Sequence, residues 1–111
     1  SVMQVAVGLS ILERPDLTAA RAAQVERERE RVASALAAIA GVEVFPSVTN
    51  FLLYRVADPA AVHRALLDAG VVVRRQDHLP GADGCLRVSI GTERENDAFL
   101  AAMETARQVR A

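Results

Sequence analysis

Residues 85–90 (CLRVSI) constrain the fold of this 111-residue chain more than any other segment. Apolar side chains alternate with other types there, which is typical of a strand that buries one face. Leu86, Val88 and Ile90 would line the core, whereas Arg87 would point to the opposite face. Such a strand needs neighbouring strands and a layer that covers its apolar side. The segment therefore predicts an α+β domain.

Turn-forming residues and apolar periodicities define the other elements. The expected order is helix 2–13, helix 16–40, strand 42–45, strand 51–56, helix 59–69, strand 71–76, strand 85–90 and a last helix from residue 93. This α-α-β-β-α-β-β-α order predicts a small three- to four-stranded sheet packed against helices, mainly on one side. We expect residues 1–111 to form a single domain, because the chain is too short for two well-filled cores.

Capping residues indicate where these helices begin and end. We expect Asp16 and Asp58 to cap the second and third helices. Thr92 and Glu95 have the spacing of a capping box at the start of the last helix. Gly70 is expected to end the third helix.

The composition argues against several classes of function. The net charge is −1 and 4% of the residues are aromatic, so we expect neither a nucleic-acid nor a membrane partner. The single cysteine, Cys85, excludes an intrachain disulfide. His63 and His78 show no metal-ligand spacing with each other or with Cys85. The sequence shows no signal peptide and no membrane span, so we expect a soluble, cytoplasmic protein.

The predicted helix 2–13 (VMQVAVGLSILE) is apolar on two faces. Such a helix is normally buried on both sides, and a domain of this size offers little cover for it. Either the helix lies in a groove of the domain, or its natural cover belongs to a part of the protein that is missing here. We favour the second explanation, and then expect residues 2–12 to allow self-association.

All 13 basic residues are arginine, and the chain contains no lysine. Chemistry that needs a lysine Schiff base is therefore excluded from this chain. Arg87 stands out because it lies inside a strand that carries no acid on the same face. A guanidinium group in this position suits a carboxylate or a phosphate, bound by two N–H groups.

Arg74 follows three valines at the end of the preceding strand and could point toward the same region as Arg87. The two arginines together would favour a ligand with two anionic groups. The alternative for each is a salt bridge on the surface or between domains.

Four other features are interpreted as structural. Cys85 is expected to be a small buried residue, and Tyr54 to serve core or interface packing. Asn50 is expected to hold the turn before its strand by side-chain hydrogen bonds. Residues 26–31 (ERERER) alternate in charge and are interpreted as a solvated helix face with ion pairs three residues apart.

Three stretches of the chain resemble a known family. Residues 47–54 (SVTNFLLY) are similar to its S-x-x-N-F strand, and residues 70–74 (GVVVR) to its G-hydrophobic-hydrophobic-V-R segment. Residues 79–97 (LPGADGCLRVSIGTEREND) resemble its long L-P-G-x-x-G-x-L-R motif and the G-T-x-x-E-N that follows. Together they resemble the C-terminal region of histidinol-phosphate aminotransferases, within the fold-type I, aspartate-aminotransferase-like superfamily.

The resemblance implies that the chain is the small domain of a homodimeric transaminase of histidine biosynthesis, which exchanges an amino group between histidinol phosphate and 2-oxoglutarate. A large domain, absent from this chain, would hold pyridoxal phosphate on a lysine. The arginine matching Arg87 would bind the substrate α-carboxylate, and the one matching Arg74 the phosphate end of the substrate. Arg75 leaves a one-residue ambiguity in this assignment. The isolated chain is expected to be inactive and to bind no cofactor.

Two alternatives stay open at this point. Other fold-type I aminotransferases, acting on aromatic or phosphorylated amino acids, carry similar motifs. A freestanding α+β module that binds an anionic metabolite without turnover would also account for the arginines.

Overall fold

The computed structural model describes residues 15–110, and the side chains of residues 19–106. The elements are α2 (Pro15–Ala37), β1 (Glu43–Val44), β2 (Phe51–Arg55), α3 (Pro59–Asp68), β3 (Arg74–Arg75), β4 (Cys85–Ser89) and α4 (Glu93–Arg110). This is the predicted order from the second helix onward. The predicted helix 2–13, and with it the self-association expected of residues 2–12, lies outside the described residues.

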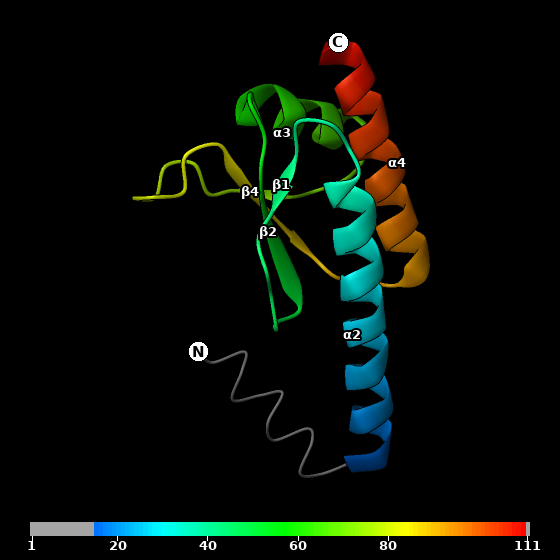
Figure 1. The fold of residues 1–111 in the computed structure, drawn as a ribbon. Coiled ribbons are helices and arrows are strands. Elements are labelled where there is room, and N and C mark those ends of the chain that lie inside the picture. Colours follow the sequence, from blue (N-terminus) through cyan, green and yellow to red (C-terminus); the bar gives the residue numbers. More distant parts are fainter. Residues whose placement is uncertain (1–14, 111) are drawn as a thin grey trace.

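The four strands form one antiparallel sheet in the order β1-β2-β4-β3. The two five-residue strands, β2 and β4, lie at its centre, and each edge strand has only two residues. Helices α2, α3 and α4 all lie on one side of this sheet (Figure 1). The predicted α+β class and the one-sided cover are therefore confirmed.

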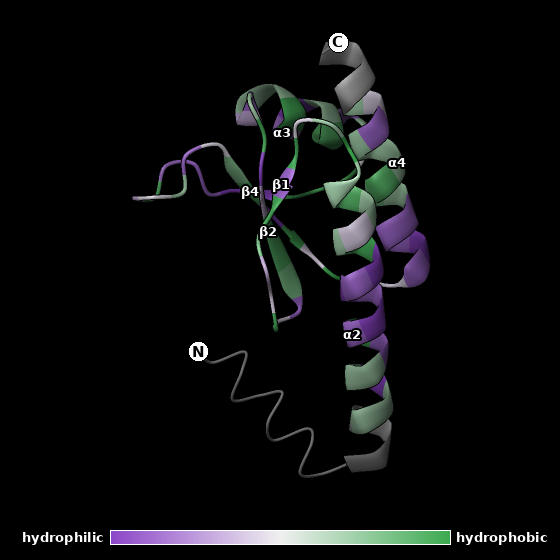
Figure 2. Ribbon diagram, viewed as in Figure 1, coloured by the Kyte–Doolittle hydropathy of each residue, from purple (hydrophilic) through white to green (hydrophobic). Residues whose placement is uncertain are grey.

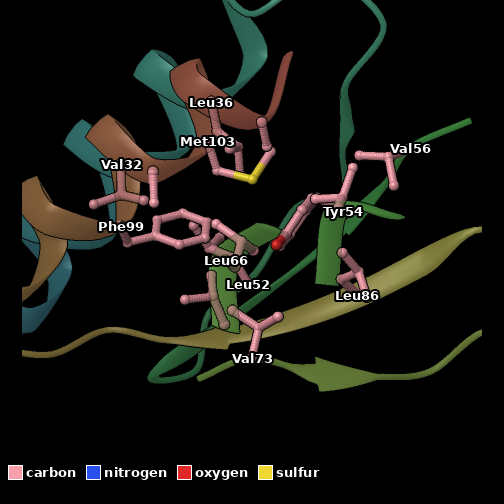
Figure 3. Close-up of a cluster of buried hydrophobic side chains, with 14 of the residues drawn as sticks. Val32, Leu36, Leu52, Tyr54, Val56, Leu66, Val73, Leu86, Phe99 and Met103 are labelled. Carbon is pink, nitrogen blue, oxygen red and sulfur yellow. The ribbon is translucent and has the colours of Figure 1, made fainter. Parts of the chain in front are cut away.

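The core lies between the sheet and the three helices (Figure 3). Alternate residues of β2 and β4, such as Leu52 and Leu86, are almost completely buried. Tyr54, on β2, packs edge-to-face against Phe99 of α4, with ring centroids 5.8 Å apart. The members of the core are Val32, Leu36, Ile39, Leu52, Tyr54, Val56, Val62, Leu66, Val73, Leu86, Val88, Ile90, Phe99, Ala102, Met103 and Ala106.

Several helix ends follow the capping residues expected from the sequence. The carboxylate of Asp58 accepts the N–H of Ala61 at 3.1 Å, which satisfies a free donor in the first turn of α3. The N–H of Thr92 donates to Glu95 Oε1 at 2.8 Å, and the N–H of Glu95 donates to Thr92 Oγ1 at 3.1 Å. Gly70 has φ +83°, the left-handed conformation that ends a helix.

Other predicted boundaries were wrong. Helix α2 begins at Pro15, so Asp16 lies inside it and is not the capping residue. Proline suits this first position because its missing N–H would have no helical partner there. The helix also ends at Ala37, three residues earlier than expected, in a turn whose Gly41 has φ +85°. The third helix, expected to run to residue 69, ends at Asp68, and the exposed Ala69 is its C-terminal cap.

The charged middle of α2 is only partly the solvated face that its sequence predicts. Its hydrophilic band lies beside the hydrophilic start of α4 (Figure 2). Glu28 pairs with Arg31 at 2.7 Å as expected, and also accepts the amide of Asn96 from α4 at 2.9 Å. Arg29 is 12% exposed and donates to the carbonyl of Thr49. The other two pairs expected at this spacing, Glu26 with Arg29 and Arg27 with Glu30, do not form within residues 19–106.

Candidate functional site

Two arginines of neighbouring strands face each other on the side of the sheet away from the helices. Arg74 of β3 and Arg87 of β4 are direct cross-strand partners. Side chains of paired residues point to the same face of an antiparallel sheet, with Cβ atoms about 5 Å apart. Leu53 of β2 is the partner of Arg87 on its other side. The two arginines singled out from the sequence are thus adjacent on one open face.

No acidic side chain among residues 19–106 pairs with either arginine. Like charges directly opposite each other destabilise a sheet. Arg74 is exposed and Arg87 is half-buried, so water screens part of this repulsion. The described part of the chain therefore leaves two arginines side by side on one face of the sheet with no counter-charge, an arrangement that favours an anion from elsewhere.

Arg75 is in a different position from Arg74, although the two are adjacent in sequence. It pairs with Leu86, a core residue, and its guanidinium group is bound by Asp77 through two contacts of 3.0 and 2.6 Å. This hydrogen-bonded carboxylate raises the pKa of Arg75, and the arginine in turn lowers the pKa of Asp77. Arg74, and not Arg75, shares a face with Arg87.

The loop before β4 owes its shape to two glycines. Gly81 and Gly84 have φ +77° and +75°, a region that other residues rarely adopt. At Gly84 a Cβ atom would also lie 2.7 Å from the carbonyl oxygen of Val56. That close approach lets the Gly84 carbonyl accept the N–H of Val56 at 2.9 Å, which sets the start of β4 against the end of β2.

Strand β3 is shorter than the predicted strand 71–76, which changes the setting of Arg74. Val73 is buried in the core, whereas Val72 is 78% exposed. None of the three valines before Arg74 belongs to a strand. Arg74 is the first residue of a two-residue edge strand, not the last residue of a longer one.

The remaining sequence candidates have structural positions. Cys85 is buried and Tyr54 is in the core, as expected. The Tyr54 hydroxyl has no hydrogen-bond partner within the described part of the chain, and burial raises its pKa. His63 is half-buried and His78 is exposed. The described residues contain no cluster of three or more His, Cys, Asp or Glu side chains that could hold a metal ion.

The role expected for Asn50 was wrong. Its side chain is exposed and makes no hydrogen bond in the structure, and only its carbonyl oxygen accepts the N–H of Ile90, at 2.7 Å. Ser47 and Thr49 hold the turn instead, because both hydroxyl groups donate to the carbonyl of Phe51, at 2.6 and 3.2 Å.

Sequence reasoning missed the residues that support β4 from the helices. Asn96 is 4% exposed and its amide closes the turn after β4. It accepts the N–H of Gly91 at 2.9 Å and donates to the carbonyl of Gly91 at 3.2 Å. The sequence signal that could have pointed to this role is an asparagine directly after Glu95, the last residue of the capping box, because a polar side chain that becomes buried needs hydrogen-bond partners.

The arginine face is open in the described residues. A hollow of about 370 Å³ between α2 and residues 44–47 is lined by Arg29 and Ser47, but by neither Arg74 nor Arg87. Enclosure of a ligand over the two arginines would therefore need a further part of a protein. None of the helices within residues 15–110 combines the length and apolar character that crossing a bilayer requires.

Comparison with curated proteins identifies relatives of the chain. Histidinol-phosphate aminotransferase of Deinococcus radiodurans is 46% identical over 83% of the chain. The histidinol-phosphate aminotransferase of Aquifex aeolicus is 48% identical over 73% of the chain. The matched parts amount to 26% and 23% of those two proteins. The chain thus spans about a quarter of the length of the curated relatives it matches.

Solved structures show the same fold. A putative aminotransferase from Burkholderia pseudomallei matches 87% of the chain with 30% of its own length, at 33% identity and a TM-score of 0.76. Histidinol-phosphate aminotransferase from Sinorhizobium meliloti, solved in complex with pyridoxal-5'-phosphate, matches 90% of the chain with 28% of its own. Its TM-score is 0.81 at 23% identity, a likeness of fold alone. The family model for aminotransferase class I and II matches residues 1–103, and the chain therefore belongs to that family.

Proposed function

We propose that this chain is the C-terminal small domain of a cytoplasmic, homodimeric, pyridoxal-phosphate-dependent transaminase of histidine biosynthesis. The full-length enzyme would exchange an amino group between histidinol phosphate and 2-oxoglutarate. The observation that carries the proposal is that Arg74 and Arg87 are neighbours on the open face of the sheet and have no acidic partner within residues 19–106. The printed names of the relatives support this choice of substrate.

The anionic groups of these substrates suit two neighbouring guanidinium groups. Glutamate and 2-oxoglutarate carry two carboxylates, and histidinol phosphate carries a phosphate. Arg87 would bind the α-carboxylate and Arg74 the phosphate end, each through two N–H groups. Arg87 stands on a central strand held from both sides, so it would orient the substrate, and closure of the domain over the substrate would exclude water.

The residues of this chain do not provide a covalent site for pyridoxal phosphate, because the chain has no lysine. The cofactor would be held by the rest of the polypeptide. We expect the 111-residue chain mixed with pyridoxal phosphate to show no absorbance band of a protein aldimine. A stable aldimine on this chain would contradict the proposal.

Steady-state kinetics of the full-length enzyme test the substrate-binding roles. We expect Arg87→Gln to lower kcat/KM for glutamate at least about 30-fold, the equivalent of about 2 kcal/mol or more for a desolvated charge pair. Arg74→Gln should lower kcat/KM for histidinol phosphate more than for glutamate. Arg75→Gln is the matched control, because Arg75 is bound by Asp77, and should leave both values within about twofold.

Equal, small effects of all three substitutions would contradict the proposal. A second phosphorylated substrate belongs in the same assay, because L-threonine-O-3-phosphate decarboxylase from Porphyromonas gingivalis is among the similar structures, at 28% identity and a TM-score of 0.69. A much higher kcat/KM with O-phospho-L-threonine than with histidinol phosphate would keep the arginine roles and replace the substrate.

A further inference from the structure

The ring of Phe51 contacts the guanidinium group of Arg87. The central carbon of the guanidinium lies 4.9 Å from the ring centroid. Phe51 is two residues before Leu53, the cross-strand partner of Arg87, so it is the diagonal neighbour on the same face. Within residues 19–106 no other side chain holds this guanidinium group by an ion pair, a hydrogen bond or a ring.

Phe51 is itself held firmly from the turn that precedes it. On the β1 side, the last backbone hydrogen bond to β2 runs from the N–H of Phe45 to the carbonyl of Leu53 at 3.0 Å, so the carbonyl of Phe51 has no strand partner there within the described residues. The hydroxyl groups of Ser47 and Thr49 donate to it instead. The carbonyl of Thr49 accepts Arg29 Nη1 of α2 at 3.1 Å. The backbone of Phe51 is thus connected to α2 through the turn that precedes it.

A second arginine on the same face also lies over a phenylalanine, but in a different setting. The guanidinium carbon of Arg55 lies 5.1 Å from the centroid of Phe45. Arg55 also donates to Glu43 at 3.0 Å and to the carbonyl of Asp83 at 2.7 Å. At Arg55 the ring is therefore added to other contacts, whereas at Arg87 it is the only side-chain contact of the guanidinium group within residues 19–106.

We propose that Phe51 is a positioning residue, which holds the Arg87 guanidinium group in the orientation that binds the substrate carboxylate. The inference rests on the proposed function, in which Arg87 is that ligand. The ring attracts the cation and covers one side of it without using any N–H group, so the fork stays available for two hydrogen bonds. An arginine restrained before binding loses less rotamer freedom when the substrate arrives.

Kinetics of the full-length enzyme test this role. We expect Phe51→Leu to raise the KM for glutamate about 5- to 15-fold with kcat changed less than about twofold, because the contact is made equally before and during the reaction. Phe51→Tyr, which keeps the ring, should restore KM to within about twofold. Phe45→Leu is the matched control and should leave KM unchanged, since Arg55 keeps its other contacts.

A normal KM in Phe51→Leu, a fall in kcat alone, or no rescue by Phe51→Tyr would each overturn the role. An equal rise in KM in Phe45→Leu would do the same. Arg87→Gln separates this inference from the proposed function: if it leaves KM unchanged, the proposed function fails, and if only Phe51→Leu is silent, the positioning role fails alone.

A spectroscopic readout covers the case in which Phe51→Leu does not fold. In the NMR spectrum of the unsubstituted chain, ring current should shift the Arg87 side-chain N–H protons upfield relative to those of Arg74, and Phe51→Tyr should keep this shift. Arg87 protons at the position of the Arg74 protons would overturn the inference.

Discussion

Leu86 and Arg87 are neighbours on β4, yet they belong to two faces of the sheet with opposite properties. Leu86 is fully buried among apolar side chains from three helices. Arg87 faces Arg74 across the strands on the side that none of the helices within residues 15–110 covers. One face therefore carries the hydrophobic stabilisation of the domain, and the other carries two arginines that no acidic side chain within residues 19–106 compensates. A single strand can therefore carry a residue for stability and a residue for binding at adjacent positions.

The largest effect is expected on the covered face. Leu86→Ala removes buried methyl groups and leaves a cavity, so it should lower the free energy of unfolding by about 2–5 kcal/mol. Urea denaturation followed by circular dichroism measures this value. A loss below about 1 kcal/mol would mean that the face is less tightly packed than the structure indicates.

The next largest effect is expected at Asn96, which connects the turn after β4 to helix α2. Asn96→Ala removes the hydrogen bonds to Gly91 and to Glu28, and should cost about 1–3 kcal/mol because the Gly91 amide loses its partner. The exposed Asp97→Ala, one residue on, is the matched control and should cost less than about 1 kcal/mol. Equal losses in the two variants would contradict the special role of the buried amide.

A smaller, pH-dependent effect is expected from Glu28. Hydrogen bonds from Arg31 and then Asn96 lower the pKa of Glu28 from 4.5 to about 2. A carboxyl group whose pKa is lower in the folded state stabilises the fold above about pH 5, and this contribution is lost as the pH falls toward 2. Urea midpoints at pH 6, 4 and 3 should therefore fall less steeply in Glu28→Gln than in the unsubstituted chain. The exposed Glu26→Gln serves as control, and parallel pH profiles for all three proteins would contradict the prediction.

The smallest effect is expected on the open face, and it has the opposite sign. Arg74→Gln relieves the repulsion from Arg87 and should raise the free energy of unfolding by about 0.2–1 kcal/mol at low salt. The gain should shrink at high ionic strength. Arg75→Gln should not raise the free energy of unfolding, because this substitution removes the ion pair between residue 75 and Asp77. Destabilisation by Arg74→Gln would show that this arginine is compensated after all.

The sequence predicted those parts of the fold that depend on local pattern. The alternation in β4, the capping box of α4 and the Asp58 cap of α3 each reflect neighbouring residues, and they were located to within a residue or two. The edge strands β1 and β3 came out too long in the prediction. Their length depends on how far a partner strand extends, which the segments themselves do not encode.

The sequence pointed to the residues of the candidate site, but not to the contacts that hold the surrounding segments in place. The face of Arg87 follows from strand alternation, while the choice between Arg74 and Arg75 needed the register between β3 and β4. Arg29 was assigned to a solvated face, because its partner, the carbonyl of Thr49, is 20 residues away. Contacts between distant segments of this kind leave no periodic signal in the sequence.

Anion titration followed by NMR at the arginine side chains tests directly whether Arg74 and Arg87 form one anion-binding site. O-phospho-L-serine, which carries a carboxylate and a phosphate, would be added to the 111-residue chain at constant ionic strength. We expect the N–H signals of Arg74 and Arg87 to shift together and to reach a plateau as the ligand concentration rises. The signals of Arg55 and Arg75, which already have acidic partners, should stay in place. Equal shifts at all four arginines, or none at Arg74 and Arg87, would contradict this expectation.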